Sequence, residues 1–110
     1  MYKIVRRIEN IKSYTFFKDK VIGIREDQIV DLDSGNVLYV AMSSLQYVHC
    51  KHLICYVNDI YGNGFYFKDS NTIISIPETF IDTAIDEKHL LVSKNDSTQL
   101  LDIELFINPY

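Results

Sequence analysis

Four side chains that could bind a metal or act as nucleophiles lie close together: His49, Cys50, His52 and Cys55. A zinc site needs four such ligands that converge in a tetrahedron. On a straight strand His49 and Cys55 would lie on one face, and Cys50 and His52 on the other. Neighbours on one face are about 7 Å apart, too far for a Cys50–His52 nucleophile pair. We therefore interpret the cluster as buried strand residues and expect no metal site.

The same alternation bears on disulfide formation. Cys50 and Cys55 are five positions apart, so on one strand they point to opposite faces and we expect no bridge between them. Reduced, buried thiols are typical of cytosolic proteins. Residues 1–7 show no signal peptide, and no run approaches the roughly 20 apolar residues of a membrane span. The sequence therefore predicts a cytoplasmic protein that does not contact a membrane.

Carboxylates at alternating positions are the second candidate for chemistry: Asp31 with Asp33, and Asp102 with Glu104. Such a pair could serve hydrolysis or bind a divalent metal, but alternation on a strand is typical of a solvated face. The chain has no glycine-rich phosphate loop, nucleophile elbow or metalloprotease motif. We predict that the protein is not an enzyme and carries no cofactor.

Charge is distributed unevenly along the chain. Residues 1–25 hold seven Lys and Arg against two carboxylates, a formal charge of +5, whereas residues 26–110 hold four Lys against thirteen, a charge of −9. Arg6, Arg7 and Lys12, with the aromatic residues of 14–17, could form a nucleic-acid footprint. The acidic remainder would repel a phosphate backbone, so we do not expect nucleic-acid binding and keep it as the alternative function.

The acidic, tyrosine-rich body favours protein recognition. Tyr61 and Tyr66 lie in and beside a glycine-containing loop and are flanked by Asp59 and Asp69. Aromatic anchors ringed by carboxylates suit a cationic protein, because they combine contact area with fast, steered association. We predict these four residues as the site that binds a basic partner.

The elements that position these residues read as strands. Eight Tyr, six Phe and only two Ala favour β structure. Residues 19–41 show a two-residue alternation in three short runs, and Asp33–Asn36 forms a turn in which Gly35 can adopt a positive φ. Residues 2–12 fit a strand or a helix; we favour a strand because strand-type residues follow at 14–17.

The remaining elements follow from turns and caps. Residues 45–57 read as one long apolar strand, 58–64 as a loop, and 65–68 with 72–76 as a hairpin. Ser75, Pro77 and Glu78 have the form of a helix start, and an apolar stripe after them predicts a short helix over residues 77–86. Residues 90–92 and 99–107 form a last hairpin around Asn95–Asp96.

A faint repeat runs through the chain, since 51–54 resembles both 88–91 and 19–22. Residues 29–39 resemble one blade segment of a β-propeller of the pyrroloquinoline-enzyme or WD type. A propeller needs at least four blades of about 40 residues, and the chain has room for fewer than three. We therefore predict a mainly β fold: one domain over residues 1–110, with a single antiparallel meander or sandwich-like sheet and one short helix.

In size, charge and composition the whole chain resembles the small, acidic, cytosolic immunity proteins encoded beside bacterial toxins. That family shares no motif, so no site residue can be transferred from it. The resemblance implies a protein-binding module that neutralises a basic, nuclease-type toxin domain by covering its active surface.

Overall fold

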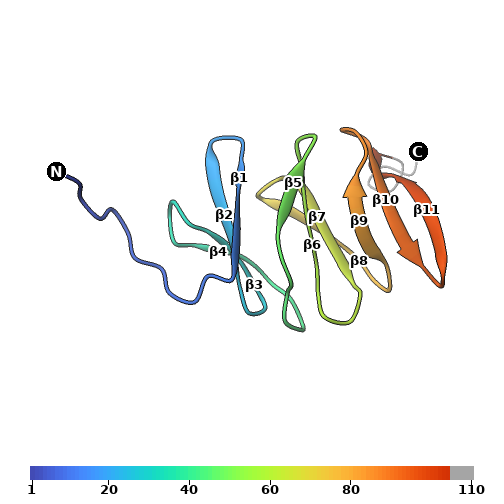
Figure 1. Cartoon of the computed structure of the whole chain (residues 1–110), viewed down its shortest axis with the longest axis horizontal. Helices are drawn as coiled ribbons and strands as arrows, with labels where there is room; N and C mark the ends of the chain where they lie inside the picture. The colour runs from blue at the N-terminus through green and yellow to red at the C-terminus, as the bar shows by residue number, and fades with distance from the viewer. Residues whose placement is uncertain (105–110) are drawn as a thin grey trace.

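The computed structural model describes residues 1–104, and within them the predicted mainly β, antiparallel fold is confirmed (Figure 1). The first sheet holds β1 (Ser13–Phe17), β2 (Lys20–Arg25), β3 (Gln28–Asp31) and β4 (Val37–Val40). The second holds β5 (His49–Lys51), β6 (Ile54–Asn58), β7 (Gly64–Asp69) and β8 (Thr72–Ile76). The third holds β9 (Phe80–Ala84), β10 (His89–Lys94) and β11 (Ser97–Asp102).

The single sheet predicted from the sequence is thus three sheets, stacked along the long axis of a molecule that measures 51 × 25 × 21 Å (Figure 1). Each sheet is an up-and-down meander in which every strand pairs with its neighbours in the chain. The residues that resemble a propeller segment form β3 and β4. Within the described residues two of the sheets have four strands each and the third has three, and the strands are three to six residues long.

Alternating side chains on the middle sheet explain the stacking. Cys55, Val57, Phe65 and Phe67 belong to a core shared with the first sheet. The intervening residues of the same strands, Tyr56 and Tyr66 among them, belong to a second core shared with the third sheet. A sheet that is covered on both faces carries continuous apolar runs. This accounts for the five consecutive buried residues of β6.

Residues 1–12 form neither the favoured strand nor a helix. The segment is attached through polar contacts: the Lys12 ammonium donates to the Leu45 carbonyl at 2.8 Å, and the Arg6 Nε donates to the Asp33 carbonyl at 3.1 Å. The strand predicted to continue through residues 14–17 is present as β1.

The predicted helix over residues 77–86 is wrong, because the chain there forms β9. Its apolar stripe has a different cause. A register shift between β9 and β10 pairs Ile81 with Val92 but Thr83 with Leu91. This irregularity turns both Ile81 and Ala84 into the core at a spacing of three, which imitates one face of a helix.

The predicted long strand over residues 45–57 is interrupted at His52 and Leu53, whose φ angles are 55° and 64°. Two successive positive φ values define the tight type I′ hairpin turn, which glycine or asparagine usually occupies. The sequence shows neither residue here, so the turn carries no sequence signal.

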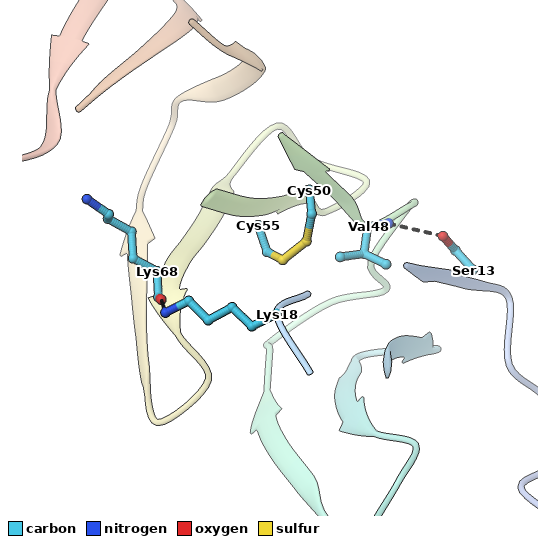
Figure 2. The surroundings of a disulfide bond; sticks show 6 residues. All are labelled: Ser13, Lys18, Val48, Cys50, Cys55 and Lys68. Carbon is cyan, nitrogen blue, oxygen red and sulfur yellow. Dashed lines mark hydrogen bonds between the residues drawn. A yellow bond between two sulfur atoms is a disulfide. The ribbon is translucent and has the colours of Figure 1, made fainter. Parts of the chain in front are cut away.

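That turn also reverses the expectation for the cysteines. Cys50 and Cys55 lie opposite each other on β5 and β6 with their Cα atoms 4.1 Å apart, and the structure joins them in a disulfide (Figure 2). Cys55 is buried in the core between the first and second sheets. Beside it, Val48 N–H donates to the Ser13 hydroxyl and the Lys18 ammonium donates to the Lys68 carbonyl (Figure 2). The bridge therefore lies where these two sheets meet.

Reduction of this disulfide should lower the free energy of unfolding by about 2 kcal/mol, the value expected for so short a loop. The measurement is urea unfolding with and without dithiothreitol, together with thiol titration of the denatured protein. A Cys50→Ser/Cys55→Ser double variant is the control, because dithiothreitol should not change its stability. Two free thiols in protein purified without reductant would contradict the bridge.

Candidate partner-binding surfaces

Asp59, one of the four predicted contact residues, is buried and serves the β6–β7 turn. Its carboxylate accepts hydrogen bonds from the backbone N–H groups of Tyr61 and Asn63, from the Asn63 amide and from the Ser43 hydroxyl, at 2.7–2.9 Å. Burial raises the pKa of the Asp59 carboxyl, but these hydrogen bonds outweigh burial and hold the pKa below its usual value. Asp59 therefore holds a turn together and presents no free carboxylate to a partner.

Tyr66 is also interior. Its side chain has no exposed surface and packs in the core between the second and third sheets. Burial raises the pKa of the Tyr66 phenol to about 12. Strand alternation places Tyr66 on the opposite face of β7 from Phe65 and Phe67, and both faces of this sheet are covered. The predicted anchoring role of Tyr66 is corrected to packing.

Tyr61 and Asp69 are exposed, but they lie at opposite ends of β7. Asp69 belongs to the β7–β8 turn, where it accepts the Asn71 N–H and borders a hollow of about 300 Å³ against the β1–β2 turn. The structure therefore does not bring the four predicted residues together.

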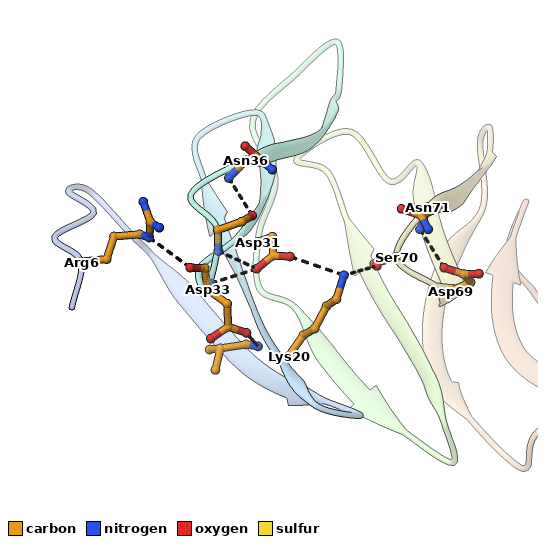
Figure 3. Close-up of polar contacts among 10 residues, drawn as sticks. Arg6, Lys20, Asp31, Asp33, Asn36, Asp69, Ser70 and Asn71 are labelled. Carbon is orange, nitrogen blue, oxygen red and sulfur yellow. Dashed lines mark hydrogen bonds and ion pairs between the residues drawn. The ribbon is translucent and has the colours of Figure 1, made fainter.

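Asp31 is buried rather than part of a solvated carboxylate face. One carboxylate oxygen accepts the N–H groups of Asp33 and Ser34, and the other lies 3.5 Å from the Lys20 ammonium. Lys20 also donates to the Ser70 hydroxyl at 3.2 Å, which links the first and second sheets (Figure 3). Asp102 pairs with His89 across the β10–β11 hairpin. These carboxylates stabilise turns and hairpins and do not converge.

The structure also shows a cleft that sequence reasoning missed. It lies between the second and third sheets and encloses about 190 Å³. Its aromatic lining comes from Tyr47, His49, Tyr56 and Phe80, and Asp82 adds a carboxylate. The His49 and Tyr56 rings lie 5.5 Å apart, and Tyr47 is 58% exposed. No pattern in the sequence indicates this cleft, because its two walls are about 30 positions apart in the chain. One wall also belongs to residues 77–86, whose pattern favours a helix.

The residues that line the cleft are chemically suited to a cation. Aromatic faces attract ammonium and guanidinium groups, most strongly where water is partly excluded. Asp82 is exposed at the same place and accepts a hydrogen bond from the Ser93 hydroxyl at 2.7 Å, which orients its carboxylate. A lysine or arginine side chain would meet ring faces and one carboxylate together.

Other candidate sites are not supported by the described residues. Within residues 1–104, no group of three or more His, Cys, Asp or Glu side chains is arranged to hold a metal ion. The same residues contain no helix that is long and apolar enough to cross a membrane. Cytoplasmic location stays a prediction, and the disulfide removes the support that free thiols gave it.

No protein-family model, curated protein or solved structure matches this chain.

Proposed function

We propose that the protein is a binding module for a basic protein partner and that the cleft between the second and third sheets receives a lysine or arginine side chain of that partner. The observation that carries the proposal is the combination of four aromatic side chains with the Asp82 carboxylate in one partly enclosed site. The expected non-enzymatic character stays part of this proposal.

Charge around the cleft supports a basic partner. Residues 80–104, which build the third sheet, hold six carboxylates against two lysines, a formal charge of −4. Exposed charge of one sign mainly raises the encounter rate with an oppositely charged protein, while buried aromatic anchors slow dissociation. On this proposal the acidic residues around the cleft raise the association rate, and the aromatic side chains in the cleft slow dissociation.

The biological role that we propose is immunity: the module inhibits a toxin domain of the basic, nuclease type by covering its active surface. Nucleases bind a polyanion and are therefore basic where they bind it. An acidic module with an aromatic cleft for a basic side chain would compete for that surface.

Nucleic-acid binding remains the alternative, and one observation favours it. Arg6, Arg7 and Arg25 surround a hollow of about 390 Å³ at the other end of the molecule. Guanidinium groups gathered in this way suit phosphate groups.

Titration with a short arginine-rich peptide, followed by amide chemical shifts, tests the proposal. We expect shifts at residues 47–49 and 80–82, affinity that falls with salt, and losses of about fivefold for Asp82→Asn and about tenfold for Tyr47→Ala. Asp69→Asn is the matched control and should not weaken binding, since Asp69 lies away from the cleft. Shifts confined to residues 6–25 with an oligothymidine probe, and none in the cleft with the peptide, would favour nucleic-acid binding instead.

A further inference from the structure

The buried polar groups that line the cleft between the second and third sheets already have partners. The Asn58 amide donates to the Ile81 carbonyl at 2.9 Å, and its oxygen accepts the Ile81 N–H at 2.7 Å. The Tyr56 hydroxyl lies 3.5 Å from the Thr83 hydroxyl, to which it donates. Asn58 and Tyr56 are each 7% exposed. Their hydrogen-bonding groups therefore serve the junction between the two sheets and not a ligand.

The exposed rim of the cleft offers few hydrogen-bond acceptors. Among the described residues that line the cleft, Asp82 is the one carboxylate, and one of its oxygens already accepts the Ser93 hydroxyl at 2.7 Å. The Gln46 side chain adds one amide oxygen. Much of the remaining rim is aromatic, because Tyr47 precedes β5 and Phe80 begins β9, and both side chains are exposed.

The cations that could enter the cleft differ in how many acceptors they need. A lysine ammonium carries three N–H donors and an arginine guanidinium carries five, and neither group has an acceptor. A donor that leaves water without finding a partner costs free energy. A trimethylated ammonium keeps the charge but has no N–H group, so it leaves water without that loss. A methylated cation therefore fits the few acceptors of the cleft better than an unmodified one.

Aromatic side chains on both walls of the cleft suit methyl groups. His49 and Tyr56 lie opposite each other on β5 and β6 with their ring centroids 5.5 Å apart, and Phe80 belongs to the facing sheet. The methyl groups of a quaternary ammonium carry part of its positive charge, so aromatic rings attract them while excluding water. Sites built from several aromatic rings recognise quaternary ammonium groups in this way.

We propose that the cleft selects a methylated ammonium group, the trimethylated side chain of a lysine in the basic partner, over an unmodified lysine. This selectivity rests on the proposed function, because it specifies the form of the side chain that the same cleft receives. Asp82 supplies the opposite charge at the rim, and the aromatic side chains supply the surface that the methyl groups contact.

Short, capped glycine–serine peptides test the selectivity through the amide chemical shifts of residues 47–49 and 80–82. Their central residue is lysine, trimethyl-lysine, or the neutral isostere in which carbon replaces the charged nitrogen. We expect the trimethyl-lysine peptide to bind about tenfold more tightly than either of the others, as one partly desolvated cation–aromatic contact provides. Binding no tighter than that of the lysine peptide, or of the neutral isostere, would overturn the proposal.

Tetramethylammonium chloride tests the source of the methylated group. It lacks the peptide, so we expect it to bind the cleft more weakly than the trimethyl-lysine peptide does. Equal affinity would overturn the proposal, because a free quaternary ammonium compound would then serve as well as the side chain of a partner.

Variants of exposed tyrosines locate the selectivity. Tyr47→Ala should lower the ratio of trimethyl-lysine to lysine affinity about threefold, whereas Tyr47→Phe keeps the aromatic ring and should keep the ratio. Tyr61→Ala, in the β6–β7 turn, is the matched control and should leave the ratio unchanged. An unchanged ratio in Tyr47→Ala would mean that the cleft does not select the methylated group.

Parallel titration with the arginine-rich peptide separates the selectivity from the proposed function. If that peptide binds in the cleft and the trimethyl-lysine peptide has no advantage over the lysine peptide, the selectivity is wrong and the proposed function stands. If the trimethyl-lysine peptide binds in the cleft and the arginine-rich peptide does not, the proposed function is wrong and the preference of the cleft for a methylated group stands.

Discussion

Replacing Gly64 by alanine should lower the free energy of unfolding by about 3 kcal/mol, at the upper end of the usual cost of overpacking. A Cβ atom at this position would lie 2.7 and 2.8 Å from two side-chain carbons of Ile81 and 2.8 Å from the Thr79 carbonyl oxygen. The carbonyl belongs to the backbone of the segment that leads into β9, so it cannot move without displacing the third sheet. Urea unfolding of the two proteins measures the difference.

Gly62→Ala is the matched control in the neighbouring turn. Gly62 has a φ of 86° but no atom within 4 Å of an added Cβ, so alanine there carries backbone strain without a clash. We expect a cost of about 1 kcal/mol. Equal losses for the two variants would mean that close approach of the sheets is not what requires Gly64.

The β class and most hairpins could be predicted because their signals are local. Alternation in residues 19–41 predicted β2 to β4, and Gly35 has the positive φ, 80°, that its turn requires. The hairpin around Asn95–Asp96 is present for the same reason, with both residues at positive φ. The part of the last strand predicted beyond residue 104 lies outside the described residues.

The errors arose where tertiary context overrides local pattern. Pro77 and Glu78 have the form of a helix start, yet Glu78 has a φ of 58° and its N–H donates to the Asn63 side chain, which fixes a turn before β9. His52 and Leu53 adopt turn geometry without turn residues, so one strand was predicted where two exist. The cross-strand disulfide was missed as a direct consequence.

The four predicted contact residues do not form one surface, for a related reason. Polar and aromatic residues near a glycine-containing loop are usually exposed. Here, however, the Asp59 carboxylate accepts the hydrogen bonds of its own turn, and Tyr66 is buried in the core between the second and third sheets. The cleft depends on how the sheets stack, which no local pattern encodes. Its aromatic residues could be seen in the sequence, but their proximity could not.

The junction between the second and third sheets also depends on one buried side chain. The Asn58 amide donates to the Ile81 carbonyl at 2.9 Å, and its oxygen accepts the Ile81 N–H at 2.7 Å. These two hydrogen bonds take the place of those that a neighbouring strand would make to Ile81, at a point where two separate sheets meet. Asn58 also pairs with Gly64 in the β6–β7 ladder, so its hydrogen bonds to Ile81 lie beside the close packing of Gly64 against Ile81 and Thr79.

Asn58→Ala should therefore lower the free energy of unfolding by about 3 kcal/mol, because it leaves two backbone groups of Ile81 buried without partners, at about 1–3 kcal/mol each. Asn71→Ala, an exposed turn substitution, should change stability by less than about 0.5 kcal/mol.

Asn58→Asp separates lost hydrogen bonding from lost packing. An ionised carboxylate accepts the Ile81 N–H but faces the Ile81 carbonyl oxygen without a proton to donate, so the folded state favours the protonated form and its pKa rises above the unfolded value. The folded state then binds the proton more tightly than the unfolded state, and stability must increase as pH falls through the folded-state pKa. Relative to wild type, the Asp variant should be least stable at neutral pH and recover below the folded-state pKa, whereas the Ala variant should show no such recovery. A constant deficit for the Asp variant across pH would show that the Asn58 bridge to Ile81 does not hold the two sheets together.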